Sequence, residues 1–76
     1  HVYNAINVDV LNRYNDGDVV DIDKLVADGI IRKTENYGLK IMGDGNLEKK
    51  LVIKADKFTA SAIQKIEKAG GTAEVL

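Results

Sequence analysis

With 76 residues, of which 45% are hydrophobic and 30% charged, the chain fits one small globular domain over residues 1–76 and excludes a disordered or collagen-like protein. It has no cysteine and only short apolar runs, which excludes disulfides, thiolate zinc sites, a transmembrane helix and a signal peptide, and favours a reducing compartment such as the cytoplasm. The net charge of −1 and the pI of about 5.7 lack the strongly basic character typical of nucleic-acid-binding domains.

The first elements predicted along the chain are a strand and a short helical turn. Residues 5–8 alternate apolar and polar side chains, as a half-buried strand does. Asp9 is the expected cap of a helical turn over residues 10–14. Residues 15–17 (Asn-Asp-Gly) should end this turn, because Asn and Gly tolerate left-handed dihedral angles.

A short helix is predicted next, over residues 22–28. Asp21 is its expected N-cap, and Val20 and Leu25 have the spacing of a hydrophobic staple around that cap. Gly29 should end the helix.

The middle of the chain predicts two strands joined by a turn. Residues 30–31 (Ile-Ile) should enter the core, and residues 34–38 are typical of a surface loop. Residues 39–42 and 51–53 are rich in branched apolar side chains and predict strands. Residues 43–46 (Gly-Asp-Gly-Asn) predict the turn between them.

The clearest helix follows Thr59, its expected N-cap, and should end at residues 70–71 (Gly-Gly) before a closing strand over residues 72–75. Phe58 and Ile63 have staple spacing, so we expect both to be largely buried and in contact. Three isoleucines should surround this pair: Ile41, Ile53 and Ile66. Strands and helices alternate throughout, which predicts the α/β class.

A dense acidic cluster is the first candidate for chemistry, with a calcium or magnesium site as its functional interpretation. Its spacing fails the EF-hand pattern, because the glycine comes too early and no Glu closes a twelve-residue loop. We therefore expect these carboxylates to face solvent or to accept from backbone amides. The cluster consists of Asp16, Asp18, Asp21 and Asp23.

The remaining candidates for chemistry are weak. The chain begins at His1 rather than Met, which indicates a fragment or an incomplete chain, and this lone terminal histidine has no partner for acid–base work. The Gly43-Asp44-Gly45 run lacks the third glycine of a phosphate loop, since Glu48 stands there, and Ser61 lacks a nucleophile-elbow context. We expect no enzyme, no cofactor and no metal site.

Charge is distributed unevenly between the two parts of the chain. Residues 1–31 hold two basic and six acidic residues, a net charge of −4, whereas residues 32–76 hold nine basic and six acidic residues, a net charge of +3. A solvated basic face is one explanation, and contacts to RNA phosphates are the other. Few aromatic residues lie among these cations, so base stacking is not indicated. The candidate RNA-binding residues are Lys49, Lys50, Lys54, Lys57, Arg32 and Lys33.

The chain resembles bacterial-type large-subunit ribosomal protein fifteen over almost its whole length. The residues that carry this resemblance lie in both halves. They are residues 6–14 (INVDVLNRY), 16–20 (DGDVV), 25–31 (LVADGII), 40–47 (KIMGDGNL), 51–59 (LVIKADKFT), Ala62, Ile66 and residues 70–71 (GG).

This resemblance implies a non-enzymatic, structural component of the large ribosomal subunit in the cytoplasm. Its partners would be 23S rRNA, whose assembly it would support, and neighbouring ribosomal proteins, with no membrane and no small-molecule substrate. The implied fold is an irregular β-β-α superhelix of short strands and two to three short helices, without the basic N-terminal arm of the family. Asp56 departs from the His or Asn of many relatives, which argues against direct phosphate contact by its loop.

The alternative is a protein-interaction module unconnected to RNA, which the net charge of −1 favours. A large exposed apolar patch would support this alternative, whereas basic residues gathered on one face would support RNA binding.

Overall fold

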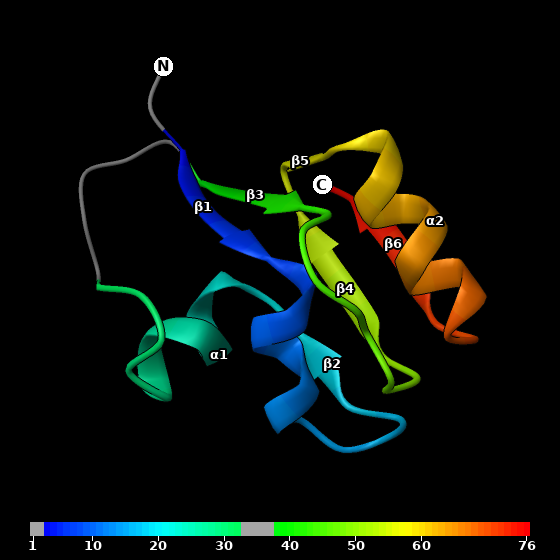
Figure 1. Cartoon of the computed structure of the whole chain (residues 1–76). Helices are drawn as coiled ribbons and strands as arrows, with labels where there is room; N and C mark the ends of the chain where they lie inside the picture. The colour runs from blue at the N-terminus through cyan, green and yellow to red at the C-terminus, as the bar shows by residue number, and fades with distance from the viewer. Residues whose placement is uncertain (1–2, 33–37) are drawn as a thin grey trace.

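The computed structural model describes residues 3–32 and 38–76 (Figure 1). Three short helices and six short strands follow one another along the described chain, with β3, β4 and β5 in succession. The elements in chain order are β1 (Asn4–Asn7), the 3-10 helix η1 (Val8–Arg13), β2 (Val19–Val20), α1 (Ile22–Ala27), β3 (Leu39–Met42), β4 (Val52–Ala55), β5 (Lys57–Phe58), α2 (Ala60–Lys68) and β6 (Thr72–Val75).

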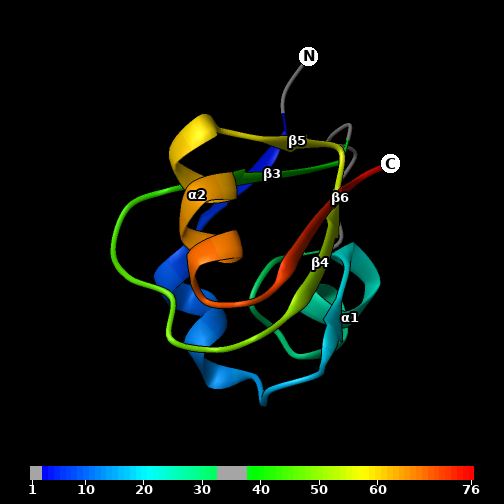
Figure 2. The ribbon, with the colours of Figure 1, turned by 90° about the vertical axis from the view of Figure 1, so that its right-hand side faces the viewer.

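The strands form two three-stranded parallel sheets. One has the order β1-β3-β5 and is called the odd sheet below; the other has the order β2-β4-β6 and is called the even sheet. The chain adds one strand to each sheet in turn, so it winds through three successive coils. Helices α1 and α2 lie on opposite sides of the molecule (Figures 1 and 2). This arrangement confirms the α/β class and the superhelical winding.

Register in the two sheets decides which side chains face the core. In the odd sheet, Ile6 pairs with Ile41, and both are buried. In the even sheet, Val20 pairs with Ile53, and both are fully buried. Because side chains alternate along a strand, the residues on either side of these inward rows face outward.

The core is one cluster of hydrophobic side chains drawn from both sheets and all three helices. Ile41, Ile53 and Ile66 are fully buried, as predicted. Phe58 and Ile63 are only partly buried, so neither belongs to the fully buried core, and Phe58 packs against that core. The reason for Phe58 is its place on β5, a two-residue strand at the edge of the odd sheet, where no further strand covers it.

The N-caps of α1 and α2 occur where the sequence predicts them. Asp21 Oδ1 accepts from the backbone N–H of Lys24 at 2.8 Å, and Thr59 Oγ1 accepts from that of Ala62 at 3.2 Å. The expected cap at Asp9 is wrong: η1 begins at Val8, two residues before the predicted start at residue 10, its N-cap is Asn7, and no side chain caps it.

Other boundaries differ by a residue or two, or lie outside the described residues. The strand expected over residues 51–53 is β4 over Val52–Ala55, and the two-residue strands β2 and β5 were not predicted. Residues 30 and 31 pack against the core, as expected. Most of the loop expected over residues 34–38 lies outside the described residues.

Candidate nucleic-acid interface

The described candidate basic residues lie on different elements of the fold. Lys54 lies on β4 of the even sheet, where it is opposite Glu74, and Lys57 lies on β5 of the odd sheet, where it is opposite Lys40. Lys49 and Lys50 precede β4.

The candidates near the end of α1 are described only in part. Arg32 is exposed and follows this helix at the edge of the described chain, and Lys33 lies outside the described residues. The five described candidates thus come from both sheets and from the segments that follow α1 and precede β4.

Asparagine side chains of the first coil fasten the segment between β3 and β4. Asn7 Oδ1 accepts from the backbone N–H of Asp44 at 3.1 Å. Asn12 makes two bonds, because its Nδ2 donates to the carbonyl of Asn46 and its Oδ1 accepts from the N–H of Glu48, each at 2.8 Å. These side-chain hydrogen bonds therefore hold the segment in one conformation despite its two glycines. The turn predicted from the sequence is part of this segment, residues 43–48, which is called the latched loop below.

The backbone of Lys50 is fixed in the same way by the loop after η1. Its N–H donates to Asp16 Oδ1 at 2.8 Å, and its carbonyl accepts from the N–H of Gly17 at 2.7 Å. A Cβ added to Gly70 would lie 3.7 Å from the aliphatic stem of Lys50. This stem therefore passes beside the C-terminal end of α2.

Gly43 and Lys65 join this loop to α2. The backbone at Gly43 is buried, and a Cβ there would overlap the Ser61 hydroxyl and lie 2.8 Å from the backbone nitrogen of Ala62. Lys65 Nζ donates to the carbonyls of Gly43 and Gly45. Only a glycine at position 43 allows the loop to approach α2 this closely. This packing explains why Gly43 is a glycine, with no need for a phosphate-binding role.

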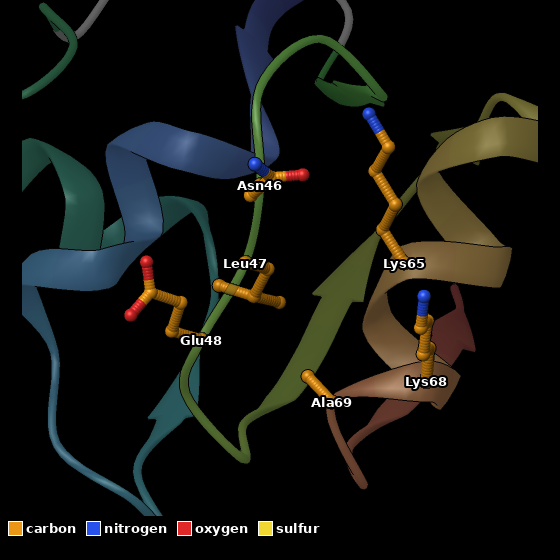
Figure 3. A pocket seen from close by; sticks show the side chains of 6 residues that line it. All are labelled: Asn46, Leu47, Glu48, Lys65, Lys68 and Ala69. Carbon is orange, nitrogen blue, oxygen red and sulfur yellow. The ribbon is translucent and has the colours of Figure 1, made fainter.

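A cleft of about 390 Å³ lies between residues 46–48 and the C-terminal half of α2 (Figure 3). Its charged groups are mixed, because the Lys65 and Lys68 side chains lie along one side while the Glu48 carboxylate turns away toward η1. Leu47 and Ala69 supply its apolar part.

The lysines of this region have a local structural reason to be there. Lys65 is held by carbonyls, and Lys68 and the stem of Lys50 lie near the C-terminal end of α2. Cations at this end are favoured by the helix dipole, whether or not a ligand is present.

The outward face of the odd sheet has a different arrangement of cations. Ala5, Lys40 and Lys57 form one cross-strand row, and this row points away from the core because the neighbouring residues Leu39 and Ile41 are fully buried. Lys57 Nζ lies 5.4 Å from the centre of the Tyr3 ring, within cation–π range.

The carboxylates of the acidic cluster accept hydrogen bonds from backbone N–H groups or face solvent, as expected. Besides Asp16 and Asp21, Asp18 Oδ2 accepts from the N–H of Asn15 at 3.0 Å, and Asp23 is exposed. Within residues 3–32 and 38–76, no group of three or more His, Cys, Asp or Glu side chains is placed to hold a metal ion.

Asp56 has a structural role that sequence reasoning missed. Its Oδ2 accepts from the N–H of Leu39 at 2.8 Å, and its own N–H donates to the Leu39 carbonyl at 3.0 Å. Gly38 lies beneath this carboxylate with a φ of 131°, where a Cβ would collide with it. A single Asp after a strand gives no sequence signal of which distant amide it meets.

Tyr14 is a buried side chain whose hydroxyl has a structural role that the sequence did not single out. Its hydroxyl donates to Asp28 Oδ2 at 2.7 Å, and Lys24 Nζ lies 5.3 Å from its ring centre. Burial, followed by the hydrogen bond to the Asp28 carboxylate, raises the pKa of Tyr14 to about 12. The phenol is therefore a structural donor that ties η1 to α1, and it stays protonated at neutral pH.

The surface contains isolated exposed apolar side chains. Within the described ranges, the exposed large hydrophobics occur on η1, on β2 and at the end of β6; they are Val10, Val19, Val75 and Leu76. No helix in that part of the protein combines the length and the hydrophobicity needed to cross a bilayer.

A family model described as ribosomal proteins 50S-L15, 50S-L18e and 60S-L27A matches residues 5–74. The matched region begins in β1 and ends in β6, so it includes strands of both sheets and all three helices.

Proposed function

Because the chain belongs to the family of ribosomal proteins 50S-L15, 50S-L18e and 60S-L27A, we propose that it binds the 23S rRNA of a bacterial large subunit and supports assembly of that RNA. The family match over residues 5–74 is the observation that carries this proposal. The bacterial type is supported by the resemblance of residues 40–47 and 51–59 to the bacterial members.

Family membership makes the protein a structural constituent of the large ribosomal subunit, which is not an enzyme class. It also implies a place on the ribosome in the cytoplasm, with rRNA and other ribosomal proteins as partners. The proposal narrows these partners to 23S rRNA and the proteins beside the domain.

Free cations on the described surface support phosphate binding. The ammonium groups of Lys49, Lys50 and Lys54 form no hydrogen bond or ion pair anywhere in the described chain. The latched backbone of the segment before β4 holds Lys50 in place without using its charge. The proposed phosphate contacts are Lys49, Lys50, Lys54, Lys57, Arg32 and Lys33.

The test is a salt titration of binding to a 23S rRNA fragment. The slope of log affinity against log salt is about −0.9 per phosphate neutralised in a duplex, so three or four contacts give a slope near −3. Lys50→Ala and Lys54→Ala should each reduce this slope by about one contact. Arg13→Ala is the matched control, because Arg13 is an exposed cation in the acidic part of the chain.

Two results would contradict the proposal. One is binding to 23S rRNA no tighter than to an unrelated RNA of equal length. The other is co-sedimentation with ribosomal proteins that survives complete removal of RNA, which is what the protein-interaction alternative predicts.

A further inference from the structure

We propose that the outward face of the odd sheet is an RNA backbone site at which Lys40 and Lys57 hold one phosphate between them. This inference rests on the proposed function and names a surface for it. Lys40 was not among the candidates taken from the sequence, and it joins Lys57 only through the register of β3 with β5.

Strand spacing brings the two ammonium groups within reach of a single ligand. Lys40 and Lys57 are direct cross-strand partners in adjacent parallel strands, and such strands lie about 4.7–4.9 Å apart. Their side chains leave the same face of the sheet, so both can contact the oxygens of one phosphate. Ala5, next in the row on β1, is exposed and small, which leaves space for a backbone to approach.

The pair costs stability when nothing is bound. Like charges directly opposite each other in a sheet are destabilising, and in the described chain neither ammonium forms an ion pair. The nearest carboxylate in the sequence is that of Asp56, which accepts from the N–H of Leu39. Unlike Lys65 and Lys68, these two lysines are not beside the C-terminal end of a helix. A bound polyanion removes the repulsion that the fold leaves in place.

Among the described residues, this face is also exposed at its two outer strands, which is unusual for a parallel sheet. Parallel sheets generally have both faces covered, yet Ala5 and Lys57 are exposed here. Figure 2 shows β3 and β5 crossing one end of the molecule, with α2 beside them and α1 farther down. An occupant is therefore expected in the assembled particle, and the charge of the face favours RNA.

Tyr3 gives the site a fixed geometry. The Lys57 ammonium lies 5.4 Å from the centre of its ring, so the side chain of Lys57 on β5 and the ring of Tyr3, which precedes β1, meet across the odd sheet. Tyr3 is itself only partly buried, so part of this residue stays accessible beside the Lys57 ammonium.

The experiment compares Lys40→Gln, Lys57→Gln and the double variant with wild type on a 23S rRNA fragment across a salt series. Glutamine keeps much of the stem and removes the charge. Each single variant should make the slope of log affinity against log salt shallower by up to about 0.9. The change in slope for the double variant should be smaller than the sum of the two single changes, because both cations contact one phosphate. Thermal unfolding should show an equal or higher Tm for the double variant, since a repulsion is removed.

Lys68→Gln is the control, because Lys68 is an exposed lysine on α2, outside this face. A double variant that folds and binds with wild-type slope would overturn this inference while leaving the proposed function intact. Wild-type protein that does not prefer 23S rRNA would instead overturn the proposed function. If polyglutamate binds the wild type but not the double variant, and RNA binding is unchanged, the face recognises an acidic protein and the inference is wrong.

Discussion

Replacing Gly43 with alanine tests the close contact between the latched loop and α2. The added methyl would meet two groups of different mobility, the exposed side chain of Ser61 and the backbone nitrogen of Ala62 at 2.8 Å. The serine can rotate away, but the backbone of Ala62 moves only if the first turn of α2 moves. That shift also strains the bonds from Lys65 to the carbonyls of Gly43 and Gly45.

Overpacking of this kind costs about 1–3 kcal/mol. This is a large share of the roughly 4–11 kcal/mol expected for the free energy of unfolding of 76 residues. Gly43→Ala should therefore lower Tm by roughly 5–20 °C. Urea unfolding followed by circular dichroism measures the change, with an unchanged m-value as the sign that the same two states are compared.

Ser61→Ala and the double variant Gly43→Ala/Ser61→Ala complete a double-mutant cycle. Ser61→Ala alone should be nearly neutral, because the side chain is exposed. The double variant should remain destabilised by most of the cost of Gly43→Ala. Full recovery in the double variant would show that only the hydroxyl was in the way, and the role given to the helix backbone would be refuted.

Two further predictions concern the core and the buried tyrosine. Ile66→Ala should cost about 2–5 kcal/mol, and more than Phe58→Ala, because Ile66 is fully buried whereas Phe58 is partly exposed; equal losses in urea unfolding would contradict the packing described. Tyr14→Phe should lower the free energy of unfolding at neutral pH by about 1.5–3 kcal/mol through the lost bond to the Asp28 carboxylate. Since the folded-state pKa of Tyr14 is raised from 10.0 to about 12, its contribution is fully present below pH 10 and lost as the pH rises through 12. A difference between wild type and Tyr14→Phe that stays constant up to pH 12 would rule this out.

Features that depend on a few neighbouring residues were predictable from the sequence. The caps at Asp21 and Thr59 occur as expected, because a capping side chain reaches an amide only three residues ahead. Equally local signals predict that α1 ends before Gly29 and α2 before Gly70. They also predict the strands that begin at Leu39 and Thr72. The family resemblance likewise rests on local runs of residues, and the family match bears it out at the level of the family.

Features that join distant coils were not predictable in this way. Asp9 has the spacing of a cap, but in the fold its side chain lies against Gly45, where an added Cβ would be 2.5 Å from that of Asp9. The strands β2 and β5 are too short to have a pattern of their own and exist because β4 and β3 offer them a pairing edge. The partial exposure of Phe58 has the same cause, because this residue lies on β5 at the edge of the odd sheet.

The sequence by itself determined the class of the fold, the ends of α1 and α2, the main buried isoleucines and an excess of positive charge after residue 31. Tertiary structure alone decided where that charge is concentrated. Lys54 and Lys57 are close in sequence but belong to different sheets, whereas Lys40 and Lys57 are far apart in sequence and directly opposite in space. The physical reason is that parallel register is set by burying Ile6 and Ile41 in one row, with Phe58 packed against the core beside them, and the outward neighbours of that row are carried into place with it.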